Sequence, residues 1–446
     1  MVFGVLLSSL FINNPAASAV PNSCKVQLAV GNSYNLTLPD EQCYDSINLG
    51  SYATLTIESN VEVYSSLDLG AYSHLNIRGS HARLINYGEA YLGDMSLVSN
   101  FDSFDNFGDL HFSYSAKLEN FSSSIFLNTN RVTMDFMSSV VNDGRVINQG
   151  ELSIRGNIQN NYGASFINQG QLIKEDIGVF ENRGLFVNQG EIRSNGTPLE
   201  PWKNTGTFEN MGSFLTNNLD QITNEGEFRN TGLFILEQGG RFQNQGSFVN
   251  SGDLVINGQF DGSGLLRMQS GNLKGSGLVE ADIFVDSNST LKPGDSIGTL
   301  DIHGDLALAG LLEIEIASAS SYDTLNVGGL LSLFDTSSFS FLLDEHHQIS
   351  DGTSFAFIKA DGFDFFEYSS FEKYFEKFSS NFFVHNLDSN LNWKIRHKND
   401  SLFIDFLTFQ VPVSQVSESS TSILLLIAVL CLIRRPKNMS SKTQRH

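Results

Sequence analysis

The stretch NTGTFENMGSF, residues 204–214, writes one small pattern twice. A single residue separates Asn204 from Gly206, and a single residue separates Asn210 from Gly212. The second Asn-x-Gly triplet recurs at intervals of 20, 20, 22, 20 and 20 residues, at Asn148, Asn168, Asn188, Asn210, Asn230 and Asn250. A period of this length predicts an array of stacked structural units, which we assign to residues 46–290.

Side chains alternate strictly within each repeat. Trp202, Phe208 and Phe214 share one parity with the Asn and Gly residues, while polar residues such as Lys203 and Glu209 occupy the other. A period of two predicts strands with the aromatic set facing inward. No helical period competes over residues 45–260, and no hairpin turn separates the units. The predicted fold class is therefore all-β, a single-stranded parallel β-helix (β-solenoid) with coils of about 20 residues and terminal caps.

Each residue type of the repeat has an expected role. Phe and Leu fill the interior and stack on their counterparts in the next coil. We expect Gly to supply a positive φ at two bends per coil, six residues apart. Asn in register predicts a hydrogen-bonded ladder of side-chain amides. The alternative is that the Asn rows form a ligand site.

The overall charge restricts the partners of the chain. The formal net charge is −22, from 27 basic and 49 acidic residues. This balance disfavours nucleic acid and direct docking on an anionic membrane surface. It is typical of a protein that stays soluble outside the cell, and the alternative is an acidic face that binds divalent cations.

The N-terminal sequence predicts export. MVFGVLLSSLFINNPAASAVPNS, residues 1–23, has an apolar run followed by Ala17-Ser18-Ala19, which predicts a signal peptide over 1–19 cleaved before Val20. No basic residue precedes Lys25, so the usual positive n-region is missing, and a first buried strand is the alternative.

An N-terminal cap is expected over residues 20–45. Cys24 and Cys43 lie close together there and could form one disulfide, which requires an oxidising compartment. Cys431 lies in an apolar run near the other end of the chain and is expected to act as a small hydrophobic residue.

The C-terminal sequence has three parts: a polar linker over 411–420, a hydrophobic segment over 421–435 and a basic tail over 436–446. This layout resembles the PEP-CTERM sorting signal of exported bacterial proteins. The aligned motif runs from Val416 through Glu418 to Thr421, with serine at both proline positions, and Arg434 and Arg435 follow the predicted hydrophobic helix. The resemblance implies export in a Gram-negative bacterium, processing by an exosortase-type enzyme and contact with the membrane before processing. It also implies final retention at the surface or release.

A second resemblance lies in LKPGDSIGTLDIHGDLALAGLLEIEI, residues 291–316, and YDTLNVGG, residues 322–329. It resembles the passenger-associated repeat of autotransporter adhesins. The matching residues are Leu291, Pro293, Gly294, Ser296, Gly298, Leu300, Ile302, Gly304, Leu312, Glu313, Ile314, Asp323, Leu325, Val327 and Gly329. The resemblance implies a right-handed β-helix of pectate-lyase-like shape with its last coils over 291–330, and it does not imply catalysis.

Residues 331–410 change in character and are expected to form a C-terminal cap. A short helix is predicted around 370–378, and NWKIRHKNDSLFIDF, residues 392–406, predicts two strands joined at Asn399-Asp400. A solenoid needs such a cap to cover its last coil.

No catalytic, cofactor or metal motif is evident. Glu151, Gln171 and Glu191 align in successive coils without forming an acidic cluster, and His346-His347 after Asp344-Glu345 is a candidate metal site. We therefore expect no enzymatic activity and no cofactor. The expected role is adhesion, biofilm or extracellular matrix, with an extracellular polysaccharide or a host or neighbouring cell surface as partner. The alternatives are a carbohydrate-active enzyme and an architectural spacer.

Overall fold

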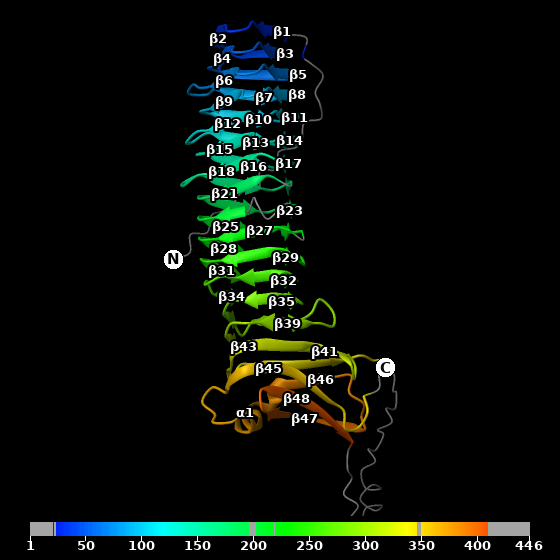
Figure 1. Cartoon of the computed structure of the whole chain (residues 1–446). Coiled ribbons are helices and arrows are strands. Elements are labelled where there is room, and N and C mark those ends of the chain that lie inside the picture. The colour runs from blue at the N-terminus through cyan, green and yellow to red at the C-terminus, as the bar shows by residue number, and fades with distance from the viewer. Residues whose placement is uncertain are drawn as a thin grey trace, which may run out of the picture.

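A computed structural model describes residues 21, 24–175, 177–195, 202–217, 219–345 and 349–408 of the chain. These residues form one parallel β-solenoid of about 14 turns, as the fold class predicted. Figure 1 shows the coils stacked along one axis, from β1 at one end to α1 and the β47–β48 pair at the other.

Through most of the array each coil contributes three short strands, and each strand pairs in parallel with the strand three places further along the chain. The solenoid therefore has three faces, which we call A, B and C. Face A contains β7 (Arg83–Asn86), β10 (Ser103–Asn106), β13 (Ile125–Asn128), β16 (Arg145–Asn148), β19 (Ser165–Asn168), β22 (Leu185–Asn188), β25 (Thr207–Asn210), β28 (Glu227–Asn230), β31 (Ser247–Asn250), β34 (Leu266–Met268), β37 (Ile283–Val285) and β40 (Leu306–Leu308).

Face B follows face A in each coil. It contains β8 (Glu89–Leu92), β11 (Asp109–Phe112), β14 (Arg131–Met134), β17 (Glu151–Ile154), β20 (Gln171–Lys174), β23 (Glu191–Ser194), β26 (Ser213–Leu215), β29 (Leu233–Leu236), β32 (Asp253–Ile256), β35 (Gly271–Gly275), β38 (Ser289–Pro293), β41 (Leu311–Ser318), β44 (Ser338–Leu343) and β46 (Phe382–His385).

Face C closes the coil. It contains β2 (Asn35–Leu38), β4 (Thr54–Ile57), β6 (His74–Ile77), β9 (Leu97–Asn100), β12 (Lys117–Asn120), β15 (Ser139–Asn142), β18 (Asn157–Asn160), β21 (Val179–Asn182), β24 (Trp202–Asn204), β27 (Gln221–Asn224), β30 (Arg241–Asn244), β33 (Gln259–Asp261), β36 (Leu278–Glu280) and β39 (Thr299–Ile302). Longer strands span two faces at the ends of the rod: β1 (Lys25–Val30), β3 (Gln42–Leu49), β5 (Asn60–Leu69), β43 (Thr324–Leu333) and β45 (Ser354–Asp364).

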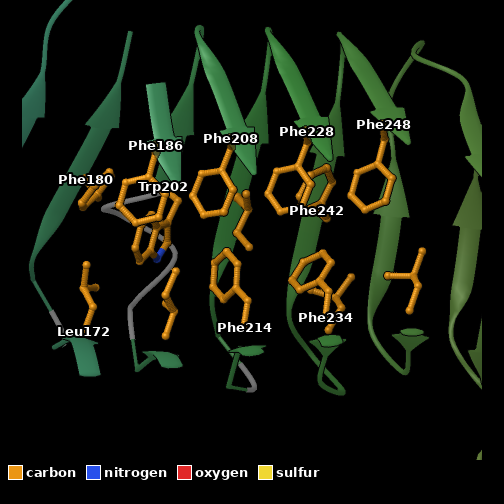
Figure 2. Close-up of a cluster of buried hydrophobic side chains, with 14 of the residues drawn as sticks. Leu172, Phe180, Phe186, Trp202, Phe208, Phe214, Phe228, Phe234, Phe242 and Phe248 are labelled. Carbon is orange, nitrogen blue, oxygen red and sulfur yellow. The ribbon is translucent and has the colours of Figure 1, made fainter. Parts of the chain in front are cut away.

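In the middle coils the interior of the rod contains a column of stacked aromatic rings. Phe186, Phe208, Phe228 and Phe248 occupy the same position on face A in successive coils, with ring centroids 4.6, 4.7 and 4.9 Å apart (Figure 2). The rings repeat at about the strand spacing of ~4.8 Å, so each one contacts the rings above and below it. The predicted inward orientation of this parity is confirmed.

The two Asn-x-Gly triplets of each coil mark two corners, as predicted. In one coil β24 ends at Asn204 and β25 begins at Thr207, while β25 ends at Asn210 and β26 begins at Ser213. The expected role of the glycines was wrong, because the triplet glycines are not among the described residues with positive φ. A Cβ atom on Gly232 would lie 2.0 Å from the carbonyl oxygen of Gly212 in the preceding coil. Glycine is therefore needed because successive corners approach too closely for any side chain.

The solenoid ends in a mixed cap. Parallel pairing continues past residue 330, since β43 pairs with β45 and β44 pairs with β46. An antiparallel hairpin of β47 (Leu391–Lys398) and β48 (Ser401–Thr408), turning at Asn399 and Asp400, then pairs with β45. The predicted short helix is α1 (Phe371–Phe378), and a 3₁₀ turn at Ser379–Asn381 follows it. A two-residue strand, β42 (Ser321–Tyr322), pairs with β41 in antiparallel orientation.

Candidate functional site

The Asn residues singled out from the repeat lie inside the solenoid as one continuous ladder. Asn148, Asn168, Asn188, Asn210, Asn230 and Asn250 are all fully buried, and Nδ2 of each donates to Oδ1 of the next over 2.6–2.8 Å. The same ladder begins three coils earlier, at Asn86, Asn106 and Asn128. A second, parallel ladder runs on face C through Asn100, Asn120, Asn142, Asn160, Asn182, Asn204, Asn224 and Asn244.

The inner amides of these ladders direct their hydrogen bonds to groups within the fold. Nδ2 of Asn168 donates to Oδ1 of Asn188 over 2.8 Å and to the carbonyl oxygen of Glu191 over 3.1 Å, while its Oδ1 accepts from Asn148. Both N–H groups are therefore used within the fold. The contacts favour a structural role for the ladder over a ligand site.

The two N-terminal cysteines meet across the first coils. Cys24 and Cys43 form a disulfide with 4.9 Å between their Cα atoms, across 19 residues of sequence. The neighbouring residues Lys25 and Tyr44 are in register in the β1–β3 pair, so the bond links two adjacent coils.

A cleft of about 270 Å³ opens on face B near the C-terminal end of the array. Its lining combines acidic, basic and amide side chains on β32, β35, β38 and β41 with the corner after β38 and a buried aspartate from the segment before β43. The lining residues are Asp253, Asn272, Lys274, Lys292, Pro293, Gly294, Asp295, Ser296, Glu313, Glu315 and Asp323. Gly294 has φ +88 and exchanges two backbone hydrogen bonds with Gly275, of 2.8 and 2.9 Å, which fixes where this corner leaves the coil.

The charges in the cleft are partly paired. Lys274 and Lys292 lie side by side in the β35–β38 register, where two like charges repel each other. Lys274 forms an ion pair with Asp295, and Nζ of Lys292 lies 2.7 Å from Oε1 of Glu313. The two pairs leave carboxylates in excess over ammonium groups among the lining residues.

Asp323 joins the cleft to the turn beneath it. It is 1% exposed and accepts two backbone N–H bonds of 2.8 Å, one from Gly298 and one from Glu315. Burial raises the pKa of Asp323 to about 6 and outweighs the two N–H bonds, which favour the charged form. A carboxyl group that holds its proton near neutral pH can act as a general acid, but both oxygens of Asp323 also fasten the corner.

The sequence pattern did not predict this cleft, although the spacing of outward residues in successive coils could have located it. Counting from Glu151 with the spacing of the repeat, twenty residues with one step of 22, correctly places Gln171, Glu191 and Asp253 in one outward row of face B. The lysines occupy the neighbouring outward row, two residues along each strand. The coils between Asp253 and Lys292 are only 18 or 19 residues long. Counting in steps of twenty therefore does not bring the two lysines into register.

Several predicted sites lie outside the described residues. These are the signal-cleavage residues Ala17, Ala19 and Val20, the sorting residues Val416, Glu418, Arg434 and Arg435, and the histidine pair at 346–347. Within the described ranges no group of three or more His, Cys, Asp or Glu side chains is placed to hold a metal ion. No helix in that part of the chain is long and apolar enough to cross a membrane.

No protein-family description matches the sequence, and no curated protein matches it.

Proposed function

We propose that the chain is exported and acts outside the cytoplasm as a rigid binding rod in adhesion, biofilm or extracellular matrix. Its partner would be an extracellular polysaccharide or a neighbouring cell surface. The disulfide between Cys24 and Cys43 is the observation that carries the proposal, because such bonds persist in oxidising compartments. The sequence before Val20 supports it, since its apolar run and Ala-x-Ala site are typical of a signal peptide.

The geometry of the rod supports a binding role. Strict register places the outward side chains of successive coils in straight rows, and neighbours within a row are about 4.8 Å apart. One face can therefore contact an extended partner at many points. The net charge of −22 favours partners other than nucleic acid or anionic lipid.

Fractionation of native host cells, with the intact mass of the protein measured in each fraction, tests the proposal. We expect protein that begins at Val20 and lacks the segment after about residue 420, found at the surface or in the medium, with Cys24 and Cys43 oxidised. Full-length, reduced protein confined to the cytoplasm would overturn export and the adhesion role with it.

A polysaccharide-acting enzyme is the second candidate, favoured by the face B cleft. Glu313 and Glu315 lie beside a protonatable Asp323 there, and glycoside hydrolysis uses a pair of carboxyl groups. Viscometry of polysaccharide solutions tests it. A fall in viscosity that is lost in Glu313→Gln and Glu315→Gln variants would establish this activity, whereas binding without turnover favours the rod.

A further inference from the structure

The corner between faces B and C carries a ridge of large, exposed side chains over six successive coils. We call it the aromatic corner, and its members are Tyr34, Tyr52, Tyr72, Met95, Tyr114, Phe136 and Met137. Each of these side chains is between 43% and 70% exposed. Five coil spacings give the ridge a length of about 24 Å. Large apolar patches on the outside of a soluble fold mark interaction sites.

The turn under the ridge has a left-handed residue at its third position, but its backbone does not require that residue to be large. Tyr52, Tyr72, Met95 and Met137 all have φ between +57° and +62°, a left-handed conformation that bulky residues rarely adopt. Further along the same corner, Gly239 occupies the same third position of a four-residue turn with φ +84. The same position holds Ser33 and Ser115 in two other turns, so the turn accepts small residues and its backbone does not call for the large side chains. An outlier of this kind points to function.

The ridge is held rigidly in place. The N–H group of Tyr52 donates to the carbonyl oxygen of Ala71 over 3.1 Å, and that of Tyr72 donates to the carbonyl oxygen of Asp94 over 2.9 Å, so each turn is fastened to the next coil. The rings of Tyr52 and Tyr72 stack with centroids 4.9 Å apart. Rigid aromatic groups lose little conformational entropy when a ligand binds them.

Charge limits the class of ligand. The six turns, residues 31–34, 50–53, 70–73, 93–96, 113–116 and 135–138, contain no Lys, Arg or His, and they include Asp94 and Asp135. A polyanion or an anionic bilayer would meet only repulsion there. The ridge combines the phenol groups of four tyrosines with two thioethers and one apolar ring, so the matching ligand is uncharged, elongated and both apolar and hydroxyl-bearing.

We propose that the aromatic corner binds a neutral polysaccharide strand laid along the axis of the solenoid. Sugar rings present C–H faces to the aromatic and thioether groups and hydroxyl edges to Tyr and Ser. This assignment rests on the proposed function and names the ligand class and the binding surface for it.

Native affinity electrophoresis of the full chain tests the proposal, in gels that contain hydroxyethyl cellulose, dextran or the polyanion alginate. The key variant is Tyr52→Gly/Tyr72→Gly, which removes two rings where glycine suits the backbone. The matched control is Tyr162→Gly, which removes a 93% exposed tyrosine from the corner between faces C and A. We expect retardation by at least one neutral glycan, a loss of at least tenfold in apparent affinity for the double variant, and an unchanged affinity for the control.

Folding is monitored by thermal melting, and Phe136→Ser provides a second variant at a turn position without positive φ. Absence of retardation by both neutral glycans, or equal retardation of the wild type and both corner variants, overturns the proposal. Two further measurements are binding to phosphatidylcholine vesicles and self-association in sedimentation velocity. If the double variant loses either of these while it still binds glycan, the proposal is also overturned. A cytoplasmic location in the host would instead overturn the proposed function and leave the gel result standing, so the two failures are distinguishable.

Discussion

Asn148 and Asn168 occupy the same position in successive coils, and Nδ2 of Asn148 donates a hydrogen bond to Oδ1 of Asn168 over 2.7 Å. Nδ2 of Asn168 in turn donates to Oδ1 of Asn188 over 2.8 Å. Each inner amide is thus both a donor and an acceptor along the axis of the rod. A fully buried amide is tolerated only when it is paired in this way, so the ladder is stable as a continuous chain.

Breaking the middle of this ladder should destabilise the coils on both sides. Asn168→Ala leaves a donor on Asn148 and an acceptor on Asn188 without their partners, and we expect a loss of about 3 kcal/mol in urea unfolding. Asn250→Ala is the control, because it leaves only the donor of Asn230 without its partner and should cost about half as much. Equal, small shifts in the two urea midpoints would contradict the ladder as a stabilising element.

The triplet glycines should tolerate no side chain, for steric rather than conformational reasons. In Gly232→Ala the new Cβ would meet the carbonyl oxygen of Gly212, 2.0 Å away, and we expect a loss of about 3 kcal/mol or more. Gly163 has φ +82 and nothing within 4 Å, so Gly163→Ala should cost only about 1 kcal/mol of left-handed strain. Thermal melting of the two variants compares these costs. A larger loss for Gly163→Ala than for Gly232→Ala would contradict the steric explanation of the triplet glycines.

Asp323 should make the C-terminal coils less stable as the pH rises. Its folded pKa of about 6 lies above the unfolded value of 3.8, so the native state holds a proton that the unfolded state releases. Its contribution to stability is fully present below pH 3.8, declines as the pH rises, and is lost once the pH passes about 6. The total change is on the order of 3 kcal/mol. Asp323→Asn cannot titrate at this position. Any stability advantage of the wild type over the variant should therefore shrink or reverse as the pH rises from 3.8 to about 6. Parallel pH profiles of the two proteins would refute the assignment.

Removing the disulfide should loosen only the first coils. Cys24→Ser frees a 19-residue loop, worth about 3 kcal/mol in the chain-entropy model. Each coil contacts only its neighbours, so hydrogen exchange should accelerate in β1–β3 and stay unchanged from β13 onward. Accelerated exchange throughout the rod would show that the coils unfold as one unit.

The sequence predicted the cap better than the corners. The short helix at Phe371–Phe378 and the hairpin turning at Asn399 were both expected, since local apolar spacing and turn residues specify them. Among the described corners between faces B and C, the length varies from the two residues 155–156 to the five residues 294–298, so no period reveals which exposed side chains align there.

By itself, the sequence determined the coil. Alternation at a period of two and repetition near twenty dictate parallel strands in register, because a shift by one residue would bury Lys203 and Glu209 and expose Phe208. Only the tertiary structure decided why Gly212 and Gly232 must be glycine, and which outward residues share a surface, as Lys292 and Glu315 do in the cleft. The reason is physical: inward side chains are fixed by packing that repeats with the sequence, whereas outward neighbours depend on the length and path of each corner.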